Sequence, residues 1–327
     1  MAVDPQRRLI YEVGLEPTTG SLLQPTGFPD IGAAEFERPV RQSDGTIEWV
    51  PSLLVESPQS MANRLEAVGW DEGADQPVPA LAGLPWVRVV NGTTGEYLTS
   101  SRTEAHRLAS AFVKDADLDG RSMKDVIRER LDLRDDTPLS ARHIAAAVMA
   151  LDPLCLIHGV FFSDKEWPGQ PKIQRAVTAV VEAHEVKTAH SGGVKKDHVR
   201  HKNVEGGGST EGYGTIPFHR TEYTAGSIVG YFTVDRDQIA AYGLGDAATD
   251  LLEAVALWEV RTLLDGGMRL RTACDLAVSG SVTDQAGDPL PDADELEARI
   301  RTGVEACAAL LGVGGPLDVE WSDAKAK

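Results

Sequence analysis

The pattern of apolar and polar positions predicts strands and helices that alternate along the chain. Short apolar runs bounded by turn residues are typical of strands, and they occur at residues 9–15, 52–56, 86–90, 154–162, 227–234, 269–278 and, as an edge strand, 318–321. Apolar residues spaced three and four apart are typical of helices, and they occur at residues 58–68, 102–113, 122–131, 140–151, 173–184, 246–265 and 294–311. The sequence has no internal repeat.

Local signals sharpen three of these boundaries. Ser57 and Pro58 supply an N-cap and a first-turn proline for the helix that follows the strand at 52–56. Ser101 and Glu104 form a capping box, which predicts that a helix opens there. The Pro and Gly residues of segment 24–32 leave little room for a helix and predict an ordered loop.

The spacing of these elements favours an α+β fold. Insertions of very different length separate the strands, and the three helical patterns between 102 and 151 predict a helical subdomain inserted into a sheet domain. This arrangement favours a sandwich of the split β-α-β kind over a regular doubly wound sheet. None of the predicted strands is followed by the glycine fingerprint of a dinucleotide site.

Composition and charge narrow the class of protein. The 327 residues are 42% hydrophobic, which is enough for one large domain or two ordinary ones. The formal net charge of -18 argues against a general polyanion binder, so any contact with nucleic acid must be local. The N-terminus lacks the apolar stretch of a signal peptide, and no apolar run is long enough to span a membrane. Three widely spaced cysteines in apolar surroundings predict buried thiols, and together these features predict a cytoplasmic protein.

One basic island stands out in this acidic chain. Residues 187–202 carry five Lys or Arg and one Asp, a net formal charge of +4. Gly192 and Gly193 would let the backbone approach an anion, and exposed amides in such a turn can cradle phosphate. Segment 190–214 is rich in Gly, Lys and His and predicts a long loop or a poorly ordered hairpin. The alternative is a solvated loop whose charge only maintains solubility.

Two other chemistries can be read from the same region. His190, His198 and His201 could bind a metal ion, but the segment has neither a nearby cysteine nor a helical HExxH arrangement. The glycine-rich stretch 206–214 lacks the Gly-Lys-Ser/Thr ending of a nucleotide loop and predicts a flexible linker.

Three further polar segments are candidates for binding or catalysis. His219 beside Arg220 could serve in a ribonuclease-like site, although no second residue fixes its geometry, so a structural role or contact with an RNA backbone is favoured. Polar side chains also occur near the start of the helix at 58–68, where backbone amides favour anions, and on one face of the strand at 269–278. These residues are Gln59, Asn63, Arg64, Arg269 and Arg271. Ordinary capping and surface ion pairing are the alternative for both segments.

Taken together and in order, six segments resemble one known family. They are Gln24–Asp30, Leu54–Glu66, Leu156–Phe161, Ser191–Lys195, Pro217–Thr224 and Arg269–Leu276. The sequence resembles the backbone subunit of type I-G (formerly I-U) CRISPR Cascade complexes, the family-seven Cas protein of the RAMP superfamily.

The resemblance implies one hand-shaped domain without a cofactor. Its palm would be RRM-like (ferredoxin-like) and comprise residues 1–90, 154–189 and 226–327. Residues 91–153 would be a helical insertion, the fingers, and residues 190–225 a thumb-like loop or hairpin. Copies of such a subunit stack head to tail along a CRISPR guide RNA, beside other Cascade subunits, and the target DNA strand is read through the guide.

Our hypothesis is a non-enzymatic subunit that binds guide RNA for antiviral defence. The predicted RNA-binding residues are Gln59, Asn63, Arg64, Ser191, Gly192, Gly193, Lys195, Lys196, Arg200, Lys202, His219, Arg220, Arg269 and Arg271. Two alternatives remain, a CRISPR RNA-processing endoribonuclease of the same superfamily that uses His219, and a metal-dependent hydrolase that uses the His190 cluster.

Overall fold

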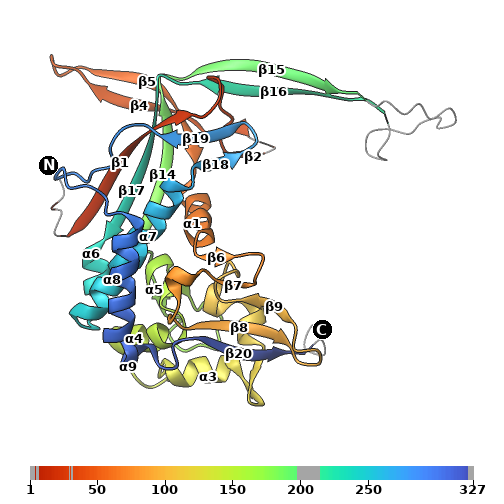
Figure 1. Ribbon diagram of the computed structural model, residues 1–327, viewed down its shortest axis with the longest axis vertical. Helices are drawn as coiled ribbons and strands as arrows, with labels where there is room; N and C mark the ends of the chain where they lie inside the picture. Colours follow the sequence, from red (N-terminus) through yellow and green to blue (C-terminus); the bar gives the residue numbers. More distant parts are fainter. Residues whose placement is uncertain (1–3, 5–6, 29, 31, 197–213, 323–327) are drawn as a thin grey trace.

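The computed structural model describes residues 4, 7–28, 30, 32–196 and 214–322. The molecule is elongated, with a large sheet at one end, a smaller sheet at the other, and two long helices running between them (Figure 1). Two hairpins leave the large sheet in opposite directions (Figure 1). The protein is therefore of the α+β class, as the sequence predicts.

Within the described residues, the large sheet has seven strands, and all of its pairings are antiparallel. Their order is β18 (Met268–Arg271), β19 (Cys274–Val278), β1 (Arg8–Pro17), β17 (Ser227–Asp235), β14 (Val177–His184), β5 (Ile47–Glu56) and β4 (Glu35–Arg41). In β1, every second residue from Leu9 to Leu15 is buried, so the apolar alternation of the sequence is the face that packs on the core.

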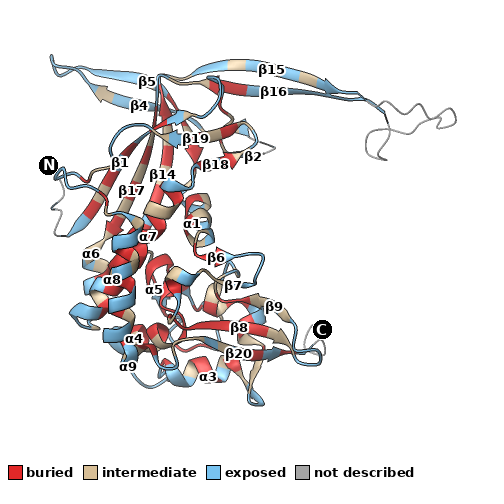
Figure 2. Cartoon of the chain, viewed as in Figure 1, coloured by how far each residue is buried: buried red, intermediate tan, exposed pale blue. Residues whose placement is uncertain are grey.

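The helices that position the sheet follow from local signals. Helix α1 (Pro58–Ala67) begins at Ser57, whose hydroxyl accepts a hydrogen bond from the Ser60 amide, as predicted. It packs on β14, and α7 (Asp246–Asp265) packs on β17. Helix α7 is buried around most of its circumference, because α8 (Ala293–Ala306), α1 and other short helices also pack against it (Figure 2). Two short helices extend this layer, α6 (Arg236–Ala240) and α9 (Ala308–Leu311).

The smaller sheet combines a middle segment of the chain with its C-terminal strand. Its order is β11 (Arg121–Ser122), β10 (Asp117–Leu118), β20 (Pro316–Trp321), β8 (Trp86–Asn91) and β9 (Tyr97–Ser100). Strand β20 lies between β10 and β8 and runs parallel to β8. The prediction that 318–321 is an edge strand is therefore wrong, since both of its sides are paired.

The remaining short elements lie around these sheets. They are the pairs β2 (Gly27–Phe28) with β3 (Gly32–Ala33) and β6 (Trp70–Asp71) with β7 (Gln76–Pro77), the 3-10 turns η1 (Pro79–Leu81) and η2 (Arg107–Ala109), and helices α2 (Ala111–Lys114), α3 (Met123–Arg130), α4 (Ala141–Leu151) and α5 (Leu154–His158). Helices α3 and α4 confirm the patterns at 122–131 and 140–151. The middle segment is thus mixed, with short strands beside its helices, rather than purely helical.

The helix predicted at 102–113 is replaced by turns, η2 and the short α2. Ser101 does not cap a helix, because its hydroxyl is buried, accepts from the Val87 amide and donates to the Asp152 carboxylate. The Ser101 hydroxyl therefore bonds to Asp152, a distant residue, instead of to a nearby backbone amide as the capping box predicts.

Two further predictions are wrong about the type of element: a predicted helix is a strand, and a predicted strand begins as a helix. Residues 173–184 form β13 (Lys172–Ile173) and β14, and β14 pairs on both sides with β17 and β5. Residues 154–162 begin instead as α5, where the Asp152 carboxylate accepts from the Leu154 amide, and end as β12 (Val160–Phe161). All five side chains of α5 are buried, and a continuous apolar run does not distinguish a buried helix from a buried strand.

The predicted loop or hairpin after residue 190 is a two-stranded hairpin in the described residues. Strands β15 (Lys187–Lys195) and β16 (Ile216–Thr224) pair antiparallel along their whole length and project away from the body (Figure 1). The prediction for residues 197–213 lies outside the described residues. The hairpin, here called the arm, comprises residues 187–196 and 216–224.

Candidate nucleic-acid interface

The arm presents a basic, solvent-exposed ribbon. Most of its residues are exposed or half-buried, and burial begins only near its base (Figure 2). Its described residues carry four cations, Lys187, Lys195, Lys196 and Arg220, and one carboxylate, the buried Glu222. A ribbon with a formal charge of +3 (four minus one) is therefore displayed by a chain whose total is -18.

Gly192 and Gly193 serve strand packing rather than a turn. They face His219 and Phe218 in the β15–β16 register. A Cβ on Gly193 would lie 3.1 Å from Cζ of Phe218, so the glycine leaves room for that ring to cross the ribbon. The Arg220 guanidinium lies 5.2 Å from the ring centroid, within the range of a cation–π contact. The expectation of a phosphate-cradling turn at these glycines is wrong, because both lie in an extended strand.

A second group of predicted residues meets at a buried carboxylate. Glu56, at the end of β5, is only 1% exposed and accepts hydrogen bonds from Ser60, Arg64 and Arg271. The Arg64 Nε–Glu56 Oε1 distance is 3.0 Å, and Arg64 also donates to the Leu270 carbonyl at 2.5 Å. Burial lowers the pKa of both arginines from the usual value.

This network changes how two predicted RNA ligands must be read. Arg271 donates to the carbonyls of Gln24 and Val55 in addition to the Glu56 carboxylate. Both arginines are thus committed to holding α1, β5 and β18 together. Their partner Glu56 was not identified from the sequence, although a carboxylate at the end of an apolar strand and directly before a helix cap is a recognisable signal.

An open cleft of about 690 Å³ lies beside this network, at the base of the arm. It is lined by Gln24, Pro25, Thr26, Gly27, Gly32, Ala33, Glu35, Thr221, Tyr223 and Arg271. Leu23 and Tyr223 exchange backbone hydrogen bonds of 2.8 and 2.9 Å, which fasten the segment before β2 to the base of β16. Burial and the hydrogen bond to Glu35 raise the pKa of Tyr223 to about 12, so its hydroxyl stays protonated. Three segments far apart in the sequence therefore meet at one site.

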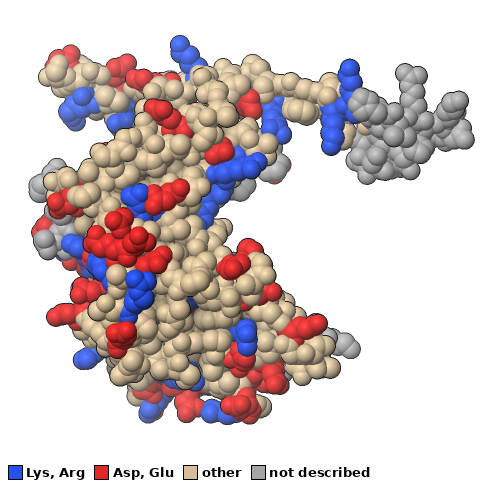
Figure 3. All heavy atoms as spheres, viewed as in Figure 1, with Lys and Arg blue, Asp and Glu red and all other residues tan. Residues whose placement is uncertain are grey.

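The remaining predicted residues fall on the surface. Gln59, Asn63 and Arg269 are exposed, on α1 and β18, and the Arg64–Leu270 contact joins those two elements. Figure 3 shows Lys and Arg gathered on the concave side near β18, whereas Asp and Glu are concentrated around α7 and α8. The structure groups the α1 and β18 residues at one place and the arm residues at another. Arg200 and Lys202 lie outside the described residues.

The structure adds nothing in favour of a catalytic or metal centre at the predicted histidines. His219 lies opposite Gly192, which has no side chain to exchange a proton with it. In the described ranges, no three His, Cys, Asp or Glu side chains form a group that could hold a metal ion. His198 and His201 of the proposed metal cluster lie outside these ranges. All three cysteines are buried and free, as predicted.

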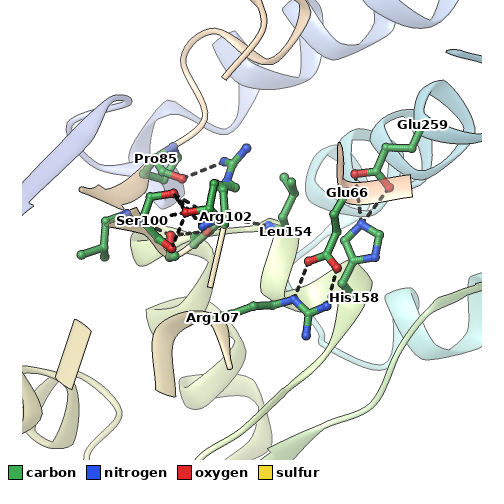
Figure 4. Close-up of polar contacts among 12 residues, drawn as sticks. Glu66, Pro85, Ser100, Arg102, Arg107, Leu154, His158 and Glu259 are labelled. Carbon is green, nitrogen blue, oxygen red and sulfur yellow. Dashed lines mark hydrogen bonds and ion pairs between the residues drawn. The ribbon is translucent and has the colours of Figure 1, made fainter. Parts of the chain in front are cut away.

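A buried histidine–carboxylate pair links α5 to the long helix α7. Both Glu259 oxygens lie within 3.0 Å of His158 Nε2, both side chains are fully buried, and Glu66 lies beside the ring (Figure 4). Burial opposes protonation of His158, but the charges of Glu259 and Glu66 outweigh it and raise its pKa. Burial also raises the pKa of Glu259, which His158 offsets only in part.

Because both pKa values are raised, the folded pair holds its proton more tightly than the unfolded chain does. The part of this stabilisation that comes from His158 is complete below pH of about 6.5, the ordinary histidine value, and is lost as the pH rises through the raised pKa of His158. The part that comes from Glu259 is complete only below the ordinary carboxyl value of about 4.5 and is lost as the pH rises through the raised pKa of Glu259. We expect the free energy of unfolding to fall over this range by at most about 1.4 kcal/mol per pH unit. Urea denaturation at several pH values measures it.

The matched variants are His158→Gln, which cannot titrate, and His143→Gln on the exposed side of α4. The first should remove the part of the pH dependence above about pH 6.5 that comes from His158, and the second should leave the pH dependence unchanged. An equal slope in wild type and His158→Gln would contradict the assignment.

Among the described residues, no helix combines the length and apolarity needed to cross a bilayer.

Comparison with known proteins identifies the family. A family model described as CRISPR-associated protein GSU0053 (Cas_GSU0053) matches residues 9–188, more than half of the chain. The chain belongs to this family of CRISPR-associated proteins. This confirms the resemblance to the family-seven Cas proteins of the RAMP superfamily, whereas the type I-G subtype stays a prediction.

No curated protein matches the chain. A solved structure titled "CRISPR RNA-guided surveillance complex, pre-nicking" is similar at 15% sequence identity and a TM-score of 0.39, and the match covers 83% of this chain and 74% of that chain. A likeness at this level does not establish a shared fold.

Proposed function

We propose that this chain is a guide-RNA-binding backbone subunit of a type I CRISPR surveillance complex and is not an enzyme. The observation that carries the proposal is the arm, a ribbon with four cations that projects from an acidic body whose family is CRISPR-associated. RNA affinity depends chiefly on cations that neutralise phosphates, and the arm displays four such cations on a thin, solvent-exposed ribbon.

The central strands of the large sheet support an RRM-like palm. Their order β19-β1-β17-β14 is that of a split β-α-β fold, with α1 in the connection from β1 to β14 and α7 in the connection from β17 to β19. The arm interrupts the link between β14 and β17. In this proposal, the arm is the thumb, and the mixed segment between β8 and α4 forms the fingers.

Two exposed apolar sets support assembly of identical copies. Val194, Ile216 and Phe218 are 45–55% exposed near the far end of the arm, and Phe36, Ile47 and Trp49 are 37–57% exposed on the β4–β5 hairpin at the other side. Two different exposed apolar surfaces on opposite sides of the molecule can contact each other in neighbouring copies. Such a heterologous, head-to-tail contact generates a filament. Such a filament would follow the guide RNA in the cytoplasm beside other Cascade subunits and meet target DNA through the guide.

Co-purification with RNA tests the proposal. The chain expressed with its partner subunits and a CRISPR array should carry RNA of discrete length, detected by absorbance at 260 nm and a denaturing gel. Protein that purifies free of RNA in that setting would contradict a guide-RNA function. Discrete shortening of added repeat RNA by the chain alone, lost in His219→Ala, would instead favour the endoribonuclease.

Salt dependence tests the electrostatic part separately. If about five cations contact the RNA backbone, the logarithm of the association constant should fall with the logarithm of salt concentration at a slope of about -3 to -4. Fluorescence anisotropy with a labelled single strand measures it between about 50 and 200 mM salt. A slope near zero would exclude phosphate contacts as the source of affinity.

A further inference from the structure

A second open cleft, of about 830 Å³, lies away from the arm. It is bounded by η2, the end of α5, and the β12–β13 pair. Its lining residues are Ala105, His106, Arg107, His158, Gly159, Val160, Phe161, Ser163, Lys172, Ile173, Gln174 and Arg175. None of them belongs to the RNA-binding set predicted from the sequence. We call it the second cleft.

The lining of the second cleft is cationic. It includes Arg107, Lys172 and Arg175 together with the exposed His106, and the lining contains neither Asp nor Glu. The second histidine of the lining, His158, is buried against Glu259 and adds no accessible charge. The whole chain has 50 acidic and 32 basic residues, whereas the charged residues that line this cleft are all basic. The charge of the lining is therefore opposite in sign to the net charge of the chain. The electrostatics of the second cleft therefore favour an anionic occupant.

The three cations are in different states. Arg107 is already bound, since its guanidinium makes two 2.6 Å hydrogen bonds to Glu66 and one of 3.1 Å to the Gly159 carbonyl. Arg175 is half-buried, and across the described chain it forms no ion pair within 4 Å and donates only a long 3.5 Å hydrogen bond to the Pro58 carbonyl. Burial and the charge of Arg107 lower the pKa of Arg175. A partly desolvated guanidinium whose N–H donors have no anionic partner is available to bind an anion through two parallel hydrogen bonds.

The cleft also holds an exposed aromatic ring. Phe161 is 47% exposed, and the Lys172 ammonium lies 5.7 Å from its ring centroid. Gly159 shapes the wall beneath, because it has a φ of 80° and a Cβ there would lie 2.8 Å from the Ile173 carbonyl oxygen. An exposed aromatic ring in a cationic cleft is the combination with which proteins bind single strands, by stacking a base and neutralising the adjoining phosphates.

We propose that the second cleft binds a segment of single-stranded nucleic acid, with Arg175 and Lys172 on its phosphates and Phe161 stacked on a base. This goes beyond the arm interface, since the two sites share no residue. It rests on the proposed function only for the source of the strand, which is either the guide RNA or the target DNA.

Anisotropy with the purified full-length chain tests the cleft directly. The probes are fluorescein-labelled 12-mers of oligo(U) and oligo(dT), at several salt concentrations. Lys172→Gln with Arg175→Gln should weaken binding about 10-fold and reduce the salt slope by about 1.4, since each phosphate contact on a single strand contributes about 0.7. Arg7→Gln with Arg301→Gln removes two exposed cations outside the cleft lining, so it is the matched control and should change neither. Wild-type affinity and slope in the double variant would overturn the proposal.

Two further variants keep the test independent of folding. Lys172 is exposed, so Lys172→Gln alone should fold normally and still reduce the slope by about 0.7. Phe161→Ala should weaken binding of oligo(U) about 10-fold but leave an abasic ribose-phosphate 12-mer unchanged, because only a base can stack. Equal losses with both probes would remove the stacking contact from the proposal.

The arm variant described below separates the two sites. If the arm variant loses RNA while the cleft variant binds normally, the proposed function stands and the second cleft is not a nucleic-acid site. The opposite result supports the second cleft and contradicts the role of the arm. A loss confined to oligo(U) in the cleft variant assigns the strand to the guide, and a loss confined to oligo(dT) assigns it to the target. A loss with both probes supports the second cleft as a site that accepts either strand.

Discussion

Replacing the four described cations of the arm together by glutamine should weaken RNA binding on the order of 100-fold at about 0.1 M salt. The replaced residues are Lys187, Lys195, Lys196 and Arg220. Each cation that neutralises a phosphate on a single strand contributes about 0.7 to the salt slope, so the slope should fall by about 3. Anisotropy with labelled oligo(U) measures both quantities, and co-purified RNA should be lost in parallel.

The control must separate local charge from net charge. Replacing four exposed cations of the body, Arg7, Arg121, Arg134 and Arg301, by glutamine changes the formal charge by the same amount, from -18 to -22 (-18 minus 4). These cations lie away from the arm, and their exposed ion pairs contribute little to stability. Equal losses in the two variants would mean that only the overall field matters, and the arm would then not be the interface.

Replacing Glu56 by alanine should lower the free energy of unfolding by about 3–5 kcal/mol. Arg64 and Arg271 would remain in a partly buried site without the carboxylate that neutralises them, and Ser60 would lose its acceptor. Removing one member of a buried ionic network costs this much because the other charges stay desolvated. Urea denaturation, evaluated by linear extrapolation, measures the loss.

Two comparisons make the Glu56 prediction specific. Glu56→Gln keeps the side-chain volume and one acceptor oxygen, so its loss should be smaller than that of Glu56→Ala. Glu129→Ala breaks an exposed pair with Arg121 and should cost less than about 1 kcal/mol. A loss below about 1 kcal/mol for Glu56→Ala would mean that the network does not stabilise the fold.

Local patterns predicted well where the signal was confined to one segment. Helix α7 spans the predicted residues, α1 begins at the predicted Ser57 cap, and the alternation of residues 9–15 is the buried face of β1. Each depends on interactions within a few residues, namely capping, periodicity and alternation, so the sequence carries the whole signal.

Predictions failed where a distant segment supplied the partner. Residues 177–184 read as a helix, but the burial of β14 between β17 and β5 overrides their spacing. The capping box at Ser101 gave way to the buried Asp152, 51 residues away. Propensity and capping contribute about 1 kcal/mol each, which tertiary pairing readily exceeds.

The candidate site divides in the same way. The basic island and the six family segments could be found in the sequence, because residue type alone marks them. The sequence could not show that Arg271 is bound to a carboxylate 215 residues away. It also could not show the second cleft, because the cations of this cleft come from separate turns and strands. The sequence by itself determined the α+β class, the family and the charge of the arm. Only the tertiary structure decided which cations form internal ion pairs and which remain available to bind a ligand. The reason is that ion pairing depends on contacts between segments that chain order does not specify.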